Sequence, residues 1–365
     1  MLNQSIRNCI EETAGLGFRL GSSTKKNKLS IKSLKVSSKK FASNSFYQRL
    51  EEIWQWYQSS NDYLEVSTSG TSGPPKVIGL KRSEILASAR LSIDHFGLNK
   101  DSRILICLPL TKIGGIMLAI RAFEARADIV LIEPQVDPLK LIEEDQEIDF
   151  VSLAPNQAAA SKDHWHKCKQ ILIGGGPISA KLEGEIMVHK GNSEFWHSYA
   201  STETLSHVAL RRIGETTYSA LAGVEFKLSE QDTLVINAAN LGIKDLETND
   251  LVQLIDSWTF IWIGRKDNVV LSGGLKLYPE TIEAKIEFNF PFFLAARADD
   301  SLGQKLVMVV EEDHYDLNEI KQKLSQLSGL ERPKELIVVA QISFTEAKKI
   351  KRKDSHGKQL YSIKL

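Results

Sequence analysis

The sequence predicts an α/β protein with a large N-terminal domain and a small α+β C-terminal domain. We expect mostly parallel sheets flanked by helices in the large domain, together with a small β region. Three observations predict this architecture. Short apolar runs alternate with helix-like segments as far as residue 190, the runs lie closer together after residue 230, and the pattern changes again near residue 265. Such alternation is typical of βαβ units and a parallel sheet.

The elements follow from the spacing of apolar residues. A first helix is expected at Phe46–Ser59, where apolar residues recur at helical intervals. Strand-like runs and helix-like segments then alternate, and three closely spaced runs predict the antiparallel β region. The strand-like runs are 103–110, 128–134, 150–155 and 170–177, the helix-like segments are 113–127, 138–147 and 179–189, and the later runs are 233–237, 251–255 and 260–263.

The last hundred residues mix both kinds of pattern. Strand-like runs at 269–272, 306–311 and 335–340 alternate with helix-like segments at 279–288 and 316–327. We place the boundary within Gly264–Asn268. The N-terminal domain then comprises residues 1–266 and the C-terminal domain residues 267–365, and this number of domains agrees with the expectation of about two from the length of the chain.

Composition excludes several classes of protein. Lys and Arg number 46, and so do Asp and Glu, so an overall basic field for nucleic acid is absent. No apolar run approaches the roughly 18 residues that a membrane span requires, because Arg121 interrupts the longest one. The 3 cysteines lie far apart without a CxxC spacing, which favours a cytoplasmic protein over a disulfide framework or a zinc site.

A lysine- and serine-rich stretch occupies residues 21–40. It carries many lysines and no acidic residue. We interpret it as a solvated surface segment, with a polyanion contact as the alternative.

Hydroxyl groups and glycines are concentrated just before Lys76. The six consecutive residues are Thr68, Ser69, Gly70, Thr71, Ser72 and Gly73. Small residues let backbone N–H groups approach phosphate oxygens, and a lysine adds a positive charge. The pattern differs from a Walker A loop because Pro75 precedes the lysine and Val77 follows it. A plain flexible turn is the alternative.

Two further motifs carry acidic or basic groups. Glu203 follows an aromatic run and stands between two threonines, a setting that suits Mg²⁺ or, alternatively, a helix N-cap. Asp250 and Arg265 could bracket a ribose at the ends of adjacent strands, and Gly273–Gly274 could admit a narrow ligand. A surface salt bridge and a hairpin turn are the alternatives. The basic stretch at 347–354 suits a solvated tail.

In this order and at these intervals, the segments resemble the acyl-adenylate-forming superfamily of CoA synthetases, adenylation domains and luciferases. The similarity runs from about Val66 to Lys353. The residues that carry it are the TSGTSGPPK loop at Thr68–Lys76, the YASTE segment at Tyr199–Glu203, Asp250, the GRKD segment at Gly264–Asp267, the SGG segment at Ser272–Gly274, and Lys349. Within the superfamily, the amino-acid sequence is most similar to the o-succinylbenzoate–CoA ligases of menaquinone biosynthesis. That similarity is carried by 108–110 with Gly114-Gly115, by 202–211 and by 264–283.

The resemblance implies an enzyme that uses ATP, Mg²⁺ and CoA to convert a small carboxylic acid into its CoA thioester. The Thr68–Lys76 loop would hold the β- and γ-phosphates, Thr202 would contact the α-phosphate, and Glu203 would hold Mg²⁺. Tyr199 would stack on adenine, and the opposite side of the base would be lined by Gly174, Gly175 and Gly176.

The resemblance also assigns roles to residues from Asp250 onwards. Asp250 would accept both ribose hydroxyls with help from Arg265, and Gly274 would line the tunnel for the pantetheine arm of CoA. Lys349 would reach the α-phosphate and the substrate carboxylate, with Lys348 and Lys351 as rivals. Asp267 matches the hinge about which a mobile C-terminal domain would turn.

o-Succinylbenzoate has a second carboxylate that should need a cationic or hydroxyl partner. The candidates are Lys112, Ser206 and His207, although His207 equally suits a core histidine. The sequence departs from the family pattern at Val77, Ala200, Lys112 and Lys348. The alternatives are a ligase for another aryl or short-chain acid, a ligase that loads a carrier protein, and a non-catalytic nucleotide-binding homologue.

Overall fold

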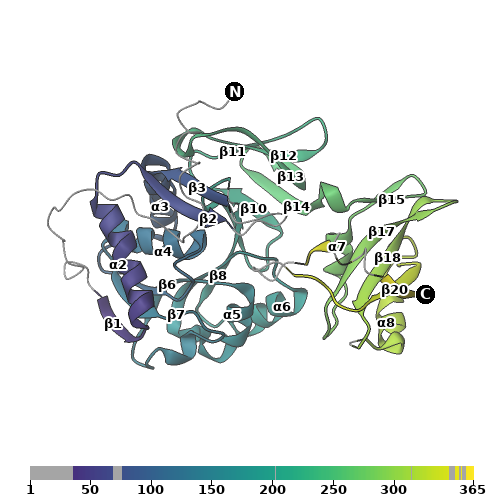
Figure 1. Cartoon of the computed structure of the whole chain (residues 1–365), viewed down its shortest axis with the longest axis horizontal. Helices are drawn as coiled ribbons and strands as arrows, with labels where there is room; N and C mark the ends of the chain where they lie inside the picture. Colours follow the sequence, from purple (N-terminus) through teal and green to yellow (C-terminus); the bar gives the residue numbers. More distant parts are fainter. Residues whose placement is uncertain are drawn as a thin grey trace.

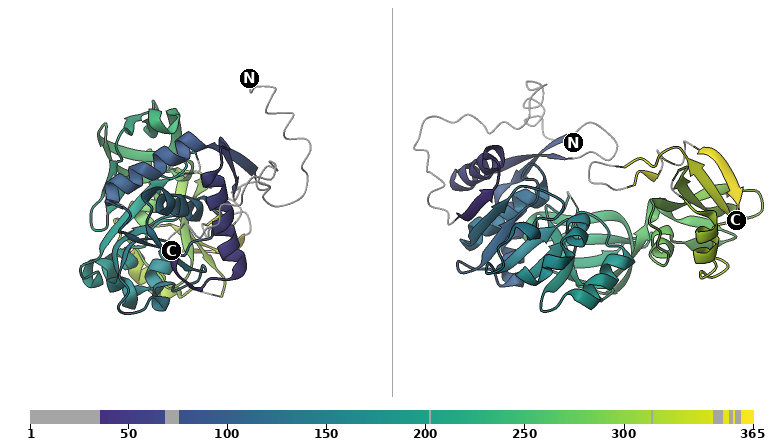
Figure 2. Two further views of the ribbon diagram at one scale, coloured as in Figure 1. Left: turned by 90° about the vertical axis from the view of Figure 1, so that its left-hand side faces the viewer. Right: turned by 90° about the horizontal axis from the view of Figure 1, so that it is seen from below.

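The structure is a computed structural model that describes residues 36–68, 76–201, 203–313, 315–344, 350–352, 355 and 359–365. A large N-terminal unit and a smaller C-terminal unit are visible in Figures 1 and 2. In chain order, the last strand of the large unit is β14 (Thr259–Arg265), and the first strand of the small unit is β15 (Val270–Ser272). The short helix η5 (Lys266–Asn268) connects them.

A single sheet of 12 strands runs through the large unit. Its first half is parallel, as the sequence predicts, and its second half is antiparallel. The strands, in spatial order, are β1 (Val36–Phe41), β5 (Asp128–Ile132), β4 (Arg103–Ile106), β6 (Ile148–Leu153), β7 (Cys168–Ile173), β8 (Glu194–Ala200), β9 (His207–Arg212), β10 (Thr217–Ala220), β14, β13 (Ile243–Asp256), β12 (Thr233–Ala238) and β11 (Glu225–Leu228). The predicted β region is therefore continuous with the parallel sheet.

Helices cover both faces of the parallel half. Along β4, Ile104 and Ile106 belong to one hydrophobic core and Leu105 to a second, because successive side chains of a strand point to opposite faces. The first core includes side chains of α2 (Asn44–Gln58), α3 (Arg82–Phe96) and α4 (Ile113–Ala125). The second includes side chains of α5 (Pro155–Ala160), η3 (Lys162–Lys167) and α6 (Ala180–His189). Among the described residues, no helix is long and apolar enough to cross a bilayer.

Two predicted helices are wrong in extent. Residues 138–147 contain only the one-turn helix η2 (Leu139–Leu141), because five polar residues follow Ile142 and leave no further apolar face to bury. The segment 279–288 is helical only in α7 (Pro279–Glu283), beyond which Ile286 and Phe288 are buried without a helix. The predicted helices at 46–59, 113–127 and 179–189 are confirmed as α2, α4 and α6.

A separate two-stranded hairpin precedes α3. Its strands are β2 (Tyr63–Thr68) and β3 (Lys76–Lys81), and they pair in register from Tyr63 opposite Lys81 to Thr68 opposite Lys76. The hairpin therefore holds together the two ends of the segment predicted to bind phosphates.

The C-terminal unit is a six-stranded sheet with α7 and α8 (Leu317–Leu324). The predicted strand and helix patterns of this region appear as β15, α7, β18, α8 and β19, while β16, β17 and β20 were not predicted. The remaining bounds are β16 (Leu275–Leu277), β17 (Phe292–Asp299), β18 (Gly303–Glu311), β19 (Glu335–Val339) and β20 (Gln359–Lys364).

Candidate functional site

The glycine run and Tyr199 meet at the carboxyl ends of β7 and β8. These strands are parallel neighbours, with Ile173 opposite His197. A side chain at Gly174 would have its Cβ 2.5 Å from Ser198 Oγ, so any other residue there would displace the Ser198 hydroxyl from its hydrogen bond to the Ile173 carbonyl. Ligands of open α/β sheets bind beyond the carboxyl ends of the strands. The predicted adenine residues therefore lie where such a ligand is expected.

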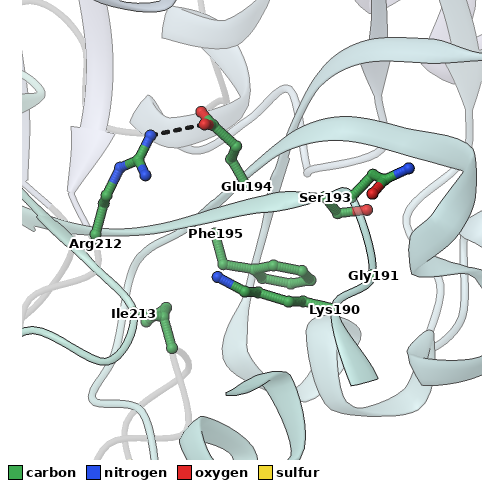
Figure 3. Close-up of a pocket in the computed structure, with 8 residues that line it drawn as sticks. Lys190, Gly191, Ser193, Glu194, Phe195, Arg212 and Ile213 are labelled. Atoms are coloured by element: carbon green, nitrogen blue, oxygen red, sulfur yellow. Dashed lines mark hydrogen bonds and ion pairs between the residues drawn. The ribbon is translucent and has the colours of Figure 1, made fainter. Parts of the chain in front are cut away.

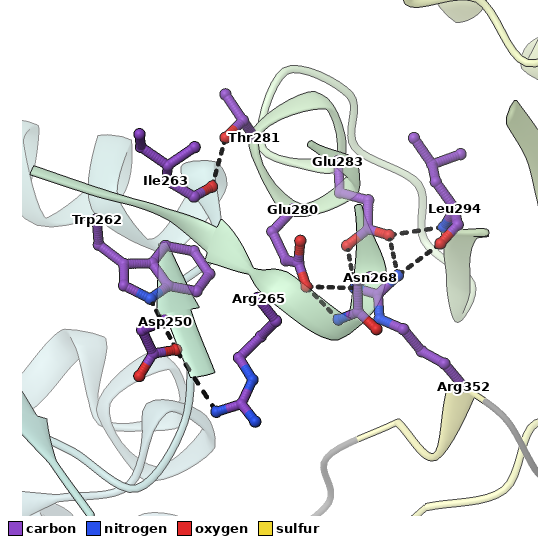
Figure 4. Close-up of polar contacts among 10 residues, drawn as sticks. All are labelled: Asp250, Trp262, Ile263, Arg265, Asn268, Glu280, Thr281, Glu283, Leu294 and Arg352. Carbon is purple, nitrogen blue, oxygen red and sulfur yellow. Dashed lines mark hydrogen bonds and ion pairs between the residues drawn. The ribbon is translucent and has the colours of Figure 1, made fainter. Parts of the chain in front are cut away.

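Asp250 is the centre of a polar cluster (Figure 4). The Tyr199 hydroxyl donates to Asp250 Oδ2 at 2.6 Å, and Trp262 Nε1 donates to Oδ1 at 3.2 Å. Arg265 lies directly opposite Asp250 in the β13–β14 pair, and its Nη1 is 3.5 Å from Oδ1. Burial and the neighbouring carboxylate raise the pKa of Tyr199, so the phenol stays a neutral donor. Asp250 keeps lone pairs for further hydroxyl donors such as those of a ribose.

Glu203 meets the first requirement of a Mg²⁺ ligand. Its side chain is exposed, and among the described residues it has no hydrogen-bond or ion-pair partner. The described residues also contain no group of three His, Cys, Asp or Glu side chains that would hold a metal by themselves. A magnesium ion at Glu203 would therefore take most of its oxygen ligands from phosphates and water, which is how this ion is usually bound.

Several predicted residues lie outside the described part of the chain. They are Ser69, Gly70, Thr71, Ser72, Gly73, Thr202, Lys348 and Lys349. For Thr68 and Lys76 the structure describes only the backbone, at the paired ends of β2 and β3. Their assigned roles stay predictions.

The sequence analysis gave no role to Arg121, whose side chain is only 2% exposed. It lies on α4 and donates from Nη2 to Ser206 Oγ, whereas its Nε has no partner. Among the described residues it forms no ion pair, and burial lowers its pKa to about 10. It is still charged at neutral pH, and a buried cation without a counter-ion is costly unless a ligand supplies the charge.

His207 is buried and bonded at both ring nitrogens. Nε2 lies 2.8 Å from Ser92 Oγ, and Nδ1 lies 3.4 Å from Ser206 Oγ. Burial, together with Arg121, lowers its pKa well below the ordinary value. Lys112 is exposed at the N-cap of α4, roughly 13 Å along the helix from Arg121. Arg121, and not Lys112, is therefore the cation of α4 that contacts Ser206.

Around η5, α7 contacts residues on both sides of the predicted hinge (Figure 4). The Thr281 hydroxyl donates to the Ile263 carbonyl at 2.6 Å, and Asn268 donates to Glu280 Oε1. Arg352 joins this group through a bidentate pair with Glu283, at 2.6 and 2.8 Å. Residues 350–352 are thereby tied to α7.

Asp267 is exposed in η5, and its carboxylate lies 3.9 Å from Arg265. Gly274 and Gly273 form the two-residue turn between β15 and β16, with φ of 82° and 58°. Such a turn requires positive φ at both positions. The turn alone therefore explains why both residues are glycine, and no ligand has to be invoked. The role of Gly274 towards CoA stays a prediction. The Lys351 backbone N–H donates to the Ser343 carbonyl, just beyond the segment 345–349.

A small cavity of about 200 Å³ lies at the other end of β8 (Figure 3). Its lining is mostly polar, and Arg212 pairs with Glu194 there at 2.6 Å. None of the predicted site residues lines this cavity, so it is separate from the candidate site.

Comparison with known proteins decides the family. The family model described as "AMP-binding enzyme" matches residues 58–242, which is half of the chain. The chain belongs to this family. The matched part of this AMP-binding enzyme contains the glycine run, Tyr199 and Glu203, while Asp250 and the C-terminal unit lie beyond it.

Similar proteins include two ligases and one solved structure. Indoleacetate–CoA ligase of Aromatoleum aromaticum is 25% identical over 79% of this chain and 65% of its own length. 2-Succinylbenzoate–CoA ligase of Listeria monocytogenes is 26% identical over 84% of this chain and 73% of its own. An acyl-CoA synthetase (AMP-forming)/AMP-acid ligase II-like protein from Dyadobacter fermentans is 28% identical, with a TM-score of 0.58 over 88% of this chain and 96% of that chain. This AMP-binding enzyme thus spans about two thirds of the length of the first ligase.

Acid should destabilise the AMP-binding enzyme through His197. Burial lowers the pKa of His197 to about 4, from 6.5 in the unfolded chain. A lowered pKa means that the unfolded state binds the proton first, so stability is complete above pH 6.5 and falls as the pH drops towards 4. We expect the free energy of unfolding to drop by about 2 kcal/mol between pH 7.5 and pH 5 from this group.

Urea unfolding at the two pH values measures this drop. His197→Gln should remove about 2 kcal/mol of the pH dependence. An equal pH dependence in the native protein and His197→Gln would refute the assignment.

Proposed function

We propose that the chain is an ATP-dependent acid–CoA ligase that acts on o-succinylbenzoate or a closely related aromatic dicarboxylic acid, in menaquinone biosynthesis. In the first step a substrate carboxylate oxygen attacks the α-phosphorus of ATP and pyrophosphate leaves. In the second step the CoA thiolate attacks the acyl carbon of the adenylate and AMP leaves. Both steps depend on positioning and charge stabilisation by the protein.

The cluster around Asp250 supports the nucleotide part of this proposal. Its carboxylate is already fixed by Tyr199, Trp262 and Arg265 and has lone pairs left for two ribose hydroxyls. The glycine run stands beside Tyr199 with no side chain to obstruct a planar base. Glu203 would hold Mg²⁺, which would neutralise phosphate charge during the first step.

The observation that carries the substrate class is that the buried Arg121 forms no ion pair with any described residue. A second carboxylate on the substrate would supply the negative charge that the described protein residues do not provide. Ser206 already accepts from Arg121 and would help to orient it, while His207 is occupied by Ser92 and Ser206. We therefore assign the second carboxylate to Arg121 and Ser206, in place of Lys112.

A ligase for an aromatic monocarboxylic acid is the second candidate, favoured by the similarity to an indoleacetate–CoA ligase. An acid of that kind would leave Arg121 without a counter-ion from the substrate or from the part of the chain that the structure describes. Burial of an unpaired cation disfavours such a complex by several kcal/mol. The dicarboxylic acid is therefore the better fit.

A pyrophosphate-release assay tests the proposal with o-succinylbenzoate, indoleacetate, benzoate and hexanoate, each with and without CoA. We expect kcat/KM for o-succinylbenzoate to exceed that for the monocarboxylic acids by roughly 100-fold or more, because a polar site rejects analogues that leave it unpaired. Equal turnover of indoleacetate would refute the substrate assignment. If none of these acids gives pyrophosphate release, the result would count against the proposal that the chain is an acid–CoA ligase.

A further inference from the structure

Tyr218 contacts residues on both sides of the proposed adenine site. It is on β10, its ring stacks on Phe260 at a centroid distance of 5.3 Å, and it meets the ring of Tyr199 edge-on at 5.9 Å. Its hydroxyl lies 2.7 Å from Nδ1 of His197. One tyrosine thus contacts the proposed stacking ring directly and the glycine run through a histidine.

The hydrogen bonds at His197 have a fixed direction. Nε2 lies 3.0 Å from the carbonyl oxygen of Gly176, which can only accept, so Nε2 carries the proton. Nδ1 therefore presents its lone pair, and the Tyr218 hydroxyl must donate to it. The chain of donors runs from Tyr218 to His197 and from His197 to Gly176.

The glycine run has no side chains of its own to hold it in place. At its first residue, the Gly174 amide donates to the Leu153 carbonyl at 3.0 Å. Gly175 follows with a φ of 83°, where the chain turns. At the far end of the run, His197 holds the Gly176 carbonyl. The distance between this end of the run and the ring of Tyr199 therefore depends on where His197 is held.

We propose that Tyr218 and His197 are positioning residues that set the width of the slot for the adenine of ATP. A planar base gains from contact on both faces only when the two walls stand at the correct spacing, and pre-organised walls lower the cost of binding. Neither side chain needs to touch the base, since each acts through Tyr199 or Gly176. This inference rests on the nucleotide site proposed above.

Calorimetric titration of the full chain with ATP and Mg²⁺, without any carboxylic acid, tests the proposal. Tyr218→Phe removes one hydroxyl and keeps the stacked ring. We expect its Kd for ATP to rise roughly three- to tenfold, the range for one lost hydrogen bond. Its Kd for inorganic tripolyphosphate, which has no base, should stay unchanged. A generally disturbed fold would weaken both ligands together.

Tyr57→Phe is the matched control. Its hydroxyl also makes a half-buried hydrogen bond of 2.7 Å, to Glu124, but on α2. This variant should bind ATP as the native chain does. His197→Ala should weaken ATP binding as Tyr218→Phe does, and His197→Gln should recover most of the loss, because an amide can donate to Gly176 and accept from Tyr218.

Two results would overturn the inference: native ATP affinity in both Tyr218→Phe and His197→Ala, or a parallel loss of ATP and tripolyphosphate affinity. Failure of the native chain to bind ATP would instead count against the proposed function.

Discussion

Replacement of Arg121 by methionine is expected to abolish turnover of o-succinylbenzoate and, at the same time, to raise the thermal stability of the unliganded protein. Loss of the cation leaves the second substrate carboxylate buried without a partner, which costs about 3–5 kcal/mol, or roughly 150- to 4,000-fold in kcat/KM. The unliganded protein gains, because the lowering of the Arg121 pKa from 12.5 to about 10 corresponds to roughly 3 kcal/mol spent on burying the charge. Pyrophosphate release and a thermal melt measure the two effects.

The variant is informative because its turnover should fall while its thermal stability should rise. Arg211→Met is the control for stability, because Arg211 is paired with Glu183 at 2.7 Å and its loss should lower the melting temperature. If Arg121→Met also melts lower than the native protein, the cation has a counter-ion after all. If its stability rises while o-succinylbenzoate is still turned over normally, Arg121 is not the partner of the second carboxylate.

Proline at position 267 is expected to separate the two half-reactions. Asp267 is exposed in η5, and its 3.9 Å approach to Arg265 contributes little, so loss of the carboxylate itself should be tolerated. Proline, however, fixes φ near −65° and disfavours the helical conformation of Lys266. If the C-terminal unit must turn about η5 between the two steps, adenylate formation should survive within about threefold and thioester formation should fall more than tenfold.

Single-turnover adenylate formation and transfer from preformed adenylate to CoA are measured separately. Asp300→Pro is the matched control. Asp300 is exposed in the turn after β17, and the residue before it is already extended. This variant should leave both steps unchanged. An equal loss of both steps in Asp267→Pro, or no loss in either, would place the hinge elsewhere.

The parallel half of the fold was predictable because burial on both faces produces continuous apolar runs, such as those of β5 and β7. The continuity between the two halves of the sheet was not. Pairing of β10 with β14, about forty residues apart, depends on contacts that no local pattern encodes. The same applies to the short η2, where Leu139 and Ile142 are buried with too few apolar neighbours to extend a helix.

The candidate site shows a similar division. The roles of the glycine run and Tyr199 were predicted from the resemblance to the acyl-adenylate-forming superfamily, whereas Asp250 was also a candidate because it and Arg265 were expected at the ends of adjacent strands. Arg121 was missed as a functional residue, although it offered a signal: it is the one cation in the helix Ile113–Ala125, whose residues before Glu124 are otherwise apolar and whose central residues are all buried. Tyr218 gave no signal, because a tyrosine in a short strand is ordinary and its role depends on the distant His197.

The β2–β3 hairpin bears on the entropy of nucleotide binding. Its last pair, Thr68 opposite Lys76, joins the two ends of the segment 69–75 before any ligand arrives. Bringing together the ends of a free seven-residue chain costs roughly 2 kcal/mol on the logarithmic scale of loop closure. Because the hairpin already holds these two ends together, a polyphosphate that binds here, as we propose, would not bear that entropic cost. With the proposed role of this segment, a hairpin weakened at its Thr68–Lys76 pair would lose triphosphate affinity without the loss of a single contact to the ligand.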